Sequence, residues 1–224
     1  EILRSRGVII VEPQSGRLAG GDIGTGRLAD TDSIASAIDS ALATSHDLAG
    51  LSVLVTAGGT REPIDAVRVI ANRSSGKQGY AIAENAARRG ATVTLVTTVD
   101  RPTFASITVI PVETADDMLR AVTCHSDSSD VIVMSAAVAD FRPVLRSAGK
   151  IKKSDGVPEI VLEKTPDILA GLGARKREGQ TLVGFAAETD DLLVHAQDKL
   201  VRKNLDLIVA NDVSAEGVGF SHDT

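Results

Sequence analysis

The sequence predicts an α/β fold built on an open, mainly parallel sheet with helices on both faces. Short apolar runs rich in branched residues predict strands at residues 53–55, 91–98, 107–112, 131–134, 182–185 and 207–210. Helical patterns fall between most of them, at residues 77–90, 115–124 and 192–204. Strands and helices that alternate at short spacing indicate this architecture. Ligands on such sheets gather at the carboxyl ends of the strands, so the residues that follow each strand are the candidate site residues.

The first crossover, residues 51–90, carries the first candidate site. Its opening strand ends in Gly58-Gly59, and Ser74-Ser75-Gly76-Lys77 stands where the next helix begins. Exposed N–H groups, the helix dipole, hydroxyls and a lysine together suit a phosphate or a carboxylate. The alternative is structural: Ser74 or Ser75 caps the helix and the glycines make a turn. Two sharper motifs fail, because Gln78 stands where a Walker A loop needs Ser or Thr, and about fifteen residues separate the glycines from the helix, too many for a dinucleotide fingerprint.

Composition excludes several classes of protein. The chain has 224 residues, 43% of them hydrophobic, which suits one large domain or one domain with an appendage. A net charge of −6, one Tyr and no Trp argue against a nucleic-acid surface. Cys124 is the only cysteine, so no disulfide framework or cysteine zinc site is expected, which fits a reducing cytoplasm. No membrane span is expected, and because the chain begins at Glu1 we expect a piece of a longer protein.

Later strand ends carry further candidates. After the strand at 131–134 come small residues and then Asp140, a hard oxygen ligand for Mg²⁺ or, alternatively, a solvated side chain or helix cap. Lys150, Lys152 and Lys153 form either a lid over a polyphosphate or a solvated loop. A strand-like run covers residues 159–162, and a helix is expected near Pro166 with Thr165 as its cap. The predicted strand before Phe185 ends there, so this ring either faces a base or lies in the core, and Lys199 and Lys203 share one helical face.

Residues 1–47 have a different character. A strand over GVIIVEP is expected to lead into a Gly-rich loop, which alone is equally well explained as a mobile linker. An amphipathic helix follows at residues 31–44, capped by Thr31 or Asp32.

Seven segments carry a resemblance to a known family. They read VTAGGTREPID, VRVIANRSSGKQG, SAAVADFRP, KIKK, LEKTPDIL, LVGFAAET and KLVRKNLDLIVANDV. In this order, from about Leu48 to Thr224, they resemble phosphopantothenoylcysteine synthetase, the second half of a bifunctional enzyme of coenzyme A biosynthesis. The run GDIGTGRLAD resembles the C-terminal tail of the flavin-dependent decarboxylase that precedes it. The resemblance implies a Rossmann-like fold, a ligase domain at 48–224, a decarboxylase tail with a connector helix at 1–47, and no FMN in this segment.

The resemblance also implies an activity and the residues that perform it. The family joins 4′-phosphopantothenate to L-cysteine through an acyl-cytidylate formed from CTP, with Mg²⁺, as a cytoplasmic dimer. Asn72 and Lys150 would be catalytic, and Asp140 would hold the metal. The nucleotide would contact Met134, Ser135, Ala136, Asp140, Lys150, Pro166, Asp167, Ile168, Leu169, Phe185, Lys199 and Lys203. The phosphate of phosphopantothenate would contact Gly58, Ser74, Ser75 and Gly76.

Some alternatives stay open. The sequence does not exclude ATP in place of CTP, and Ala66 and Arg73 depart from the family pattern beside the phosphate loop, which leaves substrate affinity open. A nucleotide-sensing module without turnover is one competing hypothesis. An NAD(P)-dependent reductase is another, but Glu84 stands four residues after Tyr80, so the Tyr-x-x-x-Lys pair of such enzymes is missing.

Overall fold

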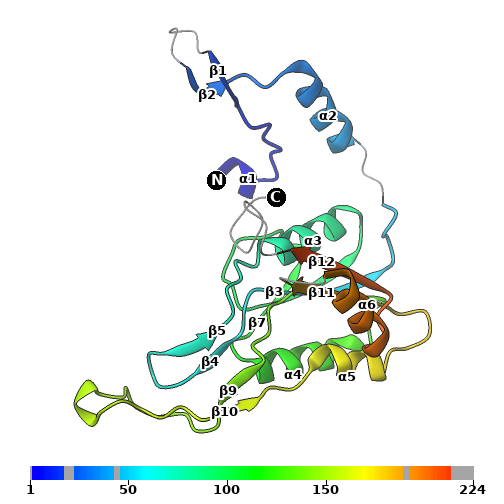
Figure 1. Ribbon diagram of the computed structural model, residues 1–224. Helices are drawn as coiled ribbons and strands as arrows, with labels where there is room; N and C mark the ends of the chain where they lie inside the picture. Colours follow the sequence, from blue (N-terminus) through cyan, green and yellow to red (C-terminus); the bar gives the residue numbers. More distant parts are fainter. Residues whose placement is uncertain (1, 18–22, 43–45, 189–191, 213–224) are drawn as a thin grey trace.

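The centre of the protein is a six-stranded parallel sheet. The computed structural model describes residues 2–17, 23–42, 46–188 and 192–212 (Figure 1). The strand order is β12-β11-β8-β3-β6-β7, and every neighbouring pair is parallel. The strands are β3 (Ser52–Ala57), β6 (Thr92–Thr97), β7 (Thr108–Pro111), β8 (Val131–Met134), β11 (Thr181–Glu188) and β12 (Leu207–Asp212). The predicted fold class is confirmed.

The order of the strands places the helices on opposite faces. From β3 the chain first moves outward to β6 and β7, then returns to the other side of β3 and continues through β8, β11 and β12. Crossovers between parallel strands are right-handed. Helices in crossovers that run in opposite directions across the sheet therefore cover opposite faces. The helices are α3 (Lys77–Arg88), α4 (Ala115–Ser126), α5 (Ile168–Ala174) and α6 (Leu192–Arg202). The direction reverses between β3 and β8, where open sheets of this kind bind ligands.

Two apolar layers hold these helices to the sheet. Successive residues of β3 face opposite sides, so Val53 and Val55 pack with Tyr80 of α3 in one buried cluster. Leu54 belongs to the second cluster, with Met118 of α4 and Leu172 of α5. The strands are apolar on both sides because both sides are covered, which explains why they read as continuous apolar runs in the sequence.

Two short hairpins extend from the sheet as an arm. One pairs β4 (Arg61–Pro63) with β5 (Val69–Ala71), and the other pairs β9 (Phe141–Pro143) with β10 (Leu162–Lys164). The chain between β9 and β10 runs along the arm, includes a short 3₁₀ turn at Lys153–Asp155, and projects beyond the body of the protein (Figure 1). Arg142 joins the second hairpin to the helix layer, because its guanidinium donates to Asp116 of α4 at 2.5 Å; it also donates to Glu163 of β10, within the hairpin, at 2.8 Å.

The N-terminal segment lies apart from the sheet in Figure 1. It contains α1 (Ile2–Ser5), an antiparallel hairpin of β1 (Gln14–Arg17) and β2 (Ile23–Arg27), and α2 (Thr31–Leu42). The strand expected over residues 7–13 is wrong, because pairing begins only at Gln14, where a partner strand is available. The expected cap of α2 is also wrong: Asp30 accepts the amide of Ser33 at 2.7 Å.

Two other sequence predictions need correction, and parts of others lie outside the described residues. The strand expected at residues 159–162 begins only at Leu162, because its register follows β9, where Leu162 pairs with Pro143. Phe185 does not follow a strand end, since β11 continues to Glu188. Residues 18–22 of the Gly-rich run, residues 43–45 at the end of the predicted connector helix, Thr189, and the segment from 213 to the end lie outside the described residues.

Candidate active site

The loops after β3 and β8 are joined into one layer at the point where the strand order reverses. The amide of Ala137 donates to the carbonyl of Gly58 at 2.8 Å, and the amide of Thr60 donates to the carbonyl of Ala137 at 3.3 Å. A parallel bridge between Gly59 and Ala137 extends the pairing of the two strands beyond their ends. The backbone at this edge is therefore fixed before any ligand binds, as a binding site requires.

Two buried threonines fix the loop after β8. The hydroxyl of Thr56 accepts the amide of Ala136 at 3.0 Å, and that of Thr60 accepts the amide of Ala139 at 2.9 Å. Ser135, in turn, donates its hydroxyl to the carbonyl of Thr56 at 2.6 Å. The predicted nucleotide residues Ser135 and Ala136, which directly follow Met134 of β8, are thus held by Thr56 of the neighbouring strand β3. Sequence reasoning missed both threonines, because their partners lie far away in the chain.

The predicted phosphate residues lie together at the start of α3. Gly76 is the residue before the helix, has φ +73°, and cannot cap the helix with a side chain. The amide of Lys77 reaches the hydroxyl of Ser75 only at 3.5 Å. Ser74 and Ser75 therefore precede a helix start that lacks a side-chain cap, an arrangement suited to an anion.

Gly58 allows the two loops to come close. Its φ is +84°, and a Cβ added there would lie 2.2 Å from the hydroxyl oxygen of Thr98. A Cβ on Gly76 would in turn lie 3.3 Å from the amide nitrogen of Gly58. Gly58 and Gly76 therefore lie close together, with little room for a side chain between them, so the first strand end and the start of α3 are neighbours.

Asn72 bridges this surface to the loop after β8. Its side-chain amide donates to the carbonyl of Val138 at 3.0 Å, and its own carbonyl lies beside Gly59, where an added Cβ would be 2.6 Å away. The residue is exposed, so its carboxamide lies at the surface between the phosphate residues and the loop that leads to Asp140. In this position it can contact a ligand that reaches both.

Asp140 lies where the loop after β8 meets the loop before α5. Thr165 joins the two, because its amide donates to the carbonyl of Asp140 at 3.0 Å and its hydroxyl donates to the carbonyl of Ala139 at 2.5 Å. Thr165 is therefore not the cap of α5; Asp167 is, and it accepts the amide of Ala170 at 3.0 Å. Pro166 is exposed, whereas the side chains of Ile168 and Leu169 are buried in the second core cluster, which leaves their backbone as the part open to a ligand.

The two lysines of the α6 region point toward α5 and β11. The ammonium group of Lys203 lies 2.7 Å from a carboxylate oxygen of Asp167, and that of Lys199 donates to the carbonyl of Phe185 at 2.8 Å. Burial alone would raise the pKa of Asp167, but hydrogen bonds from Lys203 and from the amide of Ala170, together with nearby positive charge, lower it. Phe185 itself is half-buried against the first core cluster, so both interpretations of its ring, core and ligand contact, remain compatible with its position.

Lys150 lies on the arm. It is exposed, and the segment that carries it is hydrogen-bonded to the turn between β4 and β5: Ser147 donates its amide to the carbonyl of Ile64 at 3.0 Å, and Ile151 donates its amide to Asp65 at 3.1 Å. The structure thus groups the phosphate residues, Asn72, the loop 134–140 and the start of α5, whereas Lys150 lies on a segment held by the hairpin of β4 and β5.

A magnesium ion fits this edge only if a nucleotide supplies some of its ligands. Among the described residues, no group of three His, Cys, Asp or Glu side chains converges. Asp140 is exposed at the carboxyl edge, and Mg²⁺ commonly takes one or two protein carboxylates with the remaining positions filled by substrate phosphates and water. Asp140 therefore suits a metal that arrives with a nucleotide, not one held by the protein alone.

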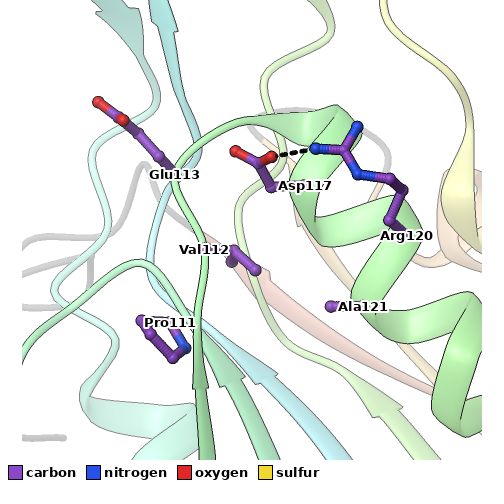
Figure 2. A pocket seen from close by; sticks show the side chains of 6 residues that line it. All are labelled: Pro111, Val112, Glu113, Asp117, Arg120 and Ala121. Carbon is purple, nitrogen blue, oxygen red and sulfur yellow. Dashed lines mark hydrogen bonds and ion pairs between the residues drawn. The ribbon is translucent and has the colours of Figure 1, made fainter.

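A separate hollow of about 610 Å³ lies between the end of β7 and α4 (Figure 2). It is lined by Pro111, Val112, Glu113, Asp117, Arg120 and Ala121, none of which the sequence singles out. Two of its three charged side chains are already engaged, since the guanidinium of Arg120 pairs with Asp117 and Asp117 also closes the capping box of α4 with Thr114 (Figure 2). We place the functional site at the strand ends instead, where chemically useful groups converge.

The buried tyrosine has a structural role. Tyr80 is fully buried in the first cluster, and its hydroxyl donates to the carbonyl of Val99 at 2.6 Å. A catalytic tyrosine needs an accessible hydroxyl, so this contact weakens the reductase hypothesis further.

The fold is that of an α/β protein with a parallel sheet, and its candidate anion site and second loop surface lie at the switch point, where such sheets commonly bind ligands. Residues 48–224 match the family described as DNA/pantothenate metabolism flavoprotein C-terminal domain, and the chain belongs to that family. Among its described residues, no helix is both long and apolar enough to cross a bilayer.

Curated relatives share nearly the whole chain. The coenzyme A biosynthesis bifunctional protein CoaBC of Mycobacterium tuberculosis (strain H37Rv) is 48% identical over 99% of this chain and 57% of its own length. The protein of the same name from Escherichia coli (strain K12) is 45% identical over 100% of this chain and 56% of its own length. The chain thus spans a little over half the length of these relatives.

Solved structures show the same fold. The crystal structure of the C-terminal domain of CoaBC is 46% identical, with a TM-score of 0.65, over 75% of this chain and 81% of that chain. A Cab2 mutant in complex with phosphopantothenate-cysteine has a TM-score of 0.60 over 76% of this chain and 78% of that chain, but at 21% identity this likeness concerns the fold alone.

Proposed function

We propose that residues 48–224 act as a phosphopantothenate–cysteine ligase that uses CTP, Mg²⁺ and L-cysteine in coenzyme A biosynthesis. In the proposed reaction the carboxylate of 4′-phosphopantothenate attacks the α-phosphorus of CTP and pyrophosphate leaves. The amine of cysteine then attacks the carbonyl carbon of the acyl-cytidylate, and CMP leaves with the bonding pair. The first step is needed because a free carboxylate is a poor electrophile at neutral pH.

The protein groups supply charge and position in this scheme. Ser74, Ser75 and the amides that follow Gly76 bind the phosphate of phosphopantothenate at the start of α3. Asn72, between this site and the loop after β8, donates a hydrogen bond to the carbonyl oxygen as it becomes negative. A bound Mg²⁺ would neutralise phosphate charge beside Asp140.

The nucleotide would lie along the loop after β8 and the start of α5. The backbone of Met134 to Ala136 and of Pro166 to Leu169 lines this path, and Phe185 packs near the base. Lys199 of α6 and Lys203, just after that helix, approach the same region, and Lys150 comes from the arm to the phosphates.

One structural observation supports the proposed function more strongly than any other. The loops after β3 and β8, which come from segments far apart in the chain, are hydrogen-bonded into a single surface that contains Gly58, Asn72 and Ala136. Two anionic reactants that must meet need adjacent sites of this kind. The names of the curated relatives agree with a role in coenzyme A biosynthesis.

The test is nucleotide-dependent release of CMP and pyrophosphate. We expect the purified protein to release both from CTP only when phosphopantothenate and cysteine are present, and parallel assays with ATP measure the nucleotide preference. The variant Lys150→Ala should lower acyl-cytidylate formation about a hundredfold, the size of loss expected when one positioned charge is removed. Lys176→Ala is the matched control, because Lys176 pairs with Asp206 at the opposite edge of the sheet.

Two outcomes would contradict the proposal. Nucleotide binding without turnover in the presence of both substrates would favour a sensing module. An unchanged rate in Lys150→Ala would remove this lysine from the mechanism.

We also propose that residues 1–47 are the tail of a decarboxylase domain with its connector, and that the ligase domain is a homodimer in the cytoplasm. The chain from β9 to β10 supports the dimer, because Leu145 and Val157 are 85% and 98% exposed and further apolar residues of the same segment, Val144, Val161 and Leu162, are exposed too; a large exposed apolar patch commonly marks a protein–protein contact. Light scattering of the purified protein measures the assembly directly.

A further inference from the structure

A buried carboxylate in the turn between β4 and β5 has no part in the mechanism above. Asp65 lies between β4 and β5 and is 2% exposed, although the hairpin itself projects from the protein. Burying an ionised carboxylate is costly unless hydrogen bonds replace its water. Asp65 has such bonds: one oxygen accepts the amides of Val67 at 2.8 Å and Arg68 at 2.9 Å.

The other carboxylate oxygen reaches a distant part of the chain. It accepts the guanidinium of Arg68 at 2.5 Å and the amide of Ile151 at 3.1 Å, across 86 residues of sequence. The same guanidinium donates to the carbonyl of Ile151 at 3.2 Å. Asp65 therefore binds the amide of Ile151 and Arg68 binds its carbonyl; we call these two contacts the grip on Ile151.

A third contact fixes the other end of this stretch. Ser147 donates its amide to the carbonyl of Ile64, which directly precedes Asp65, at 3.0 Å. We call residues 147–151 the lysine segment. It is attached to the hairpin turn at Ser147 and at Ile151, and Lys150 lies between these two points.

The charge of Asp65 matters for this grip. Hydrogen bonds, first that from the amide of Val67, hold the pKa of Asp65 at about 2, so the group is ionised at neutral pH and can accept from all four donors. An asparagine keeps one acceptor oxygen, but its NH₂ group would face the guanidinium of Arg68 and the amide of Ile151, both of which are donors.

We propose that Asp65 is a positioning residue that holds the lysine segment, and through it Lys150, in the geometry needed for activation of the carboxylate. This inference rests on the proposed function. A lysine on an unrestrained surface segment must be ordered in every turnover, whereas a segment fixed at two points keeps its ammonium group within a small volume. Asp65 acts without contact to the substrate.

The first experiment measures the segment itself. Hydrogen–deuterium exchange of the peptide that contains Ile151 should be faster in Asp65→Asn than in the wild-type protein, with no nucleotide added. Arg68→Met removes only the second half of the grip and should raise exchange in the same peptide. Asp206→Asn is the matched control, since Asp206 also accepts one backbone amide and one lysine, but at the opposite edge of the sheet. Unchanged exchange in Asp65→Asn would overturn the proposal.

The second experiment tests whether Asp65 acts through Lys150. Single-turnover formation of the acyl-cytidylate should fall about tenfold to a hundredfold in Asp65→Asn, the range for a displaced catalytic group. In a Lys150→Ala background the same substitution should cause no further loss, because its target is already gone. Independent, additive losses in the double variant would refute the positioning role, as would a normal rate in Asp65→Asn.

The two experiments separate this inference from the proposed function. A wild-type protein that makes no acyl-cytidylate refutes the proposed ligase, and with it the catalytic part of the inference. The exchange measurement then decides by itself whether Asp65 holds the lysine segment.

Discussion

Glu62 offers a test of how the arm is attached to the sheet. This residue of β4 is 2% exposed, and its carboxylate accepts the amide of Ala115, the first residue of α4, at 2.8 Å. Ala115 is fully buried, so no water can replace that acceptor. Glu62 thus satisfies a helix-start amide that local capping by Thr114 and Asp117 leaves over, and it joins the hairpin to the helix layer.

The expected cost follows from these contacts. Glu62→Ala leaves a buried amide without an acceptor, which costs about 1–3 kcal/mol, and removes one buried methylene group at about 0.8 kcal/mol. We therefore expect a loss of about 2–4 kcal/mol in the free energy of unfolding. Glu62→Gln keeps an acceptor oxygen and loses only the interaction of the charge with the helix start, about 1 kcal/mol.

The assay is urea unfolding of both variants. Tyr80 is the only tyrosine, the chain has no tryptophan, and Tyr80 is fully buried, so its fluorescence reports the core directly. Linear extrapolation gives the free energy of unfolding for each protein. Equal losses in the two variants would show that the amide of Ala115 is not the group that matters, and losses below about 1 kcal/mol in Glu62→Ala would refute the anchoring role.

Three further predictions follow from individual contacts. Asn72→Asp should let acyl-cytidylate accumulate, because a carboxylate cannot donate to the developing oxyanion; rapid-quench analysis measures it, and normal amide formation would contradict the assigned role. The lowered pKa of Asp65, about 2 against an ordinary 3.8, means that its ionised form stabilises the folded state at neutral pH and that this stabilisation disappears as the pH falls from about 4 through 2. Unfolding followed by circular dichroism should therefore show that the free energy of unfolding falls less steeply between about pH 4 and pH 2 in Asp65→Asn than in the wild-type protein. The same pH dependence in both proteins would contradict this prediction. Thr98→Val should leave stability unchanged or raise it by about 1 kcal/mol in thermal unfolding, because the buried hydroxyl of Thr98 has no partner among the described residues; a clear loss would mean that the hydroxyl has one.

Much of the fold was predictable because its signals are local. The strand at residues 131–134 has the predicted bounds, and the helix after Thr114 begins where predicted, since branched apolar runs and helical spacing act over a few neighbouring residues. The strand predicted at residues 159–162 was misplaced because its bounds are set by a distant partner and not by its near neighbours. Its bounds depend on pairing with β9, which lies about twenty residues earlier in the chain.

Much less of the site was predictable from residue patterns. The sequence pointed to the strand ends and, through family resemblance, to Asn72, Asp140 and Lys150. It gave no sign that the hydroxyls of Thr56 and Thr60 hold the loop after β8, because buried threonines in strands are ordinary core residues. Nor did it show that Thr165 binds Ala139 and leaves the cap of α5 to Asp167.

By itself, then, the sequence determined the alternation of strands and helices, the parallel sheet that this alternation requires, and the family. Only the tertiary structure decided which groups meet: Glu62 with Ala115, Asp65 with Ile151, and Lys203 with Asp167. The physical reason is the range of the interactions. Backbone preference and apolar periodicity are set by near neighbours, whereas the partner of a buried polar group is set by strand order and crossover direction, which bring segments tens of residues apart to the same edge of the sheet.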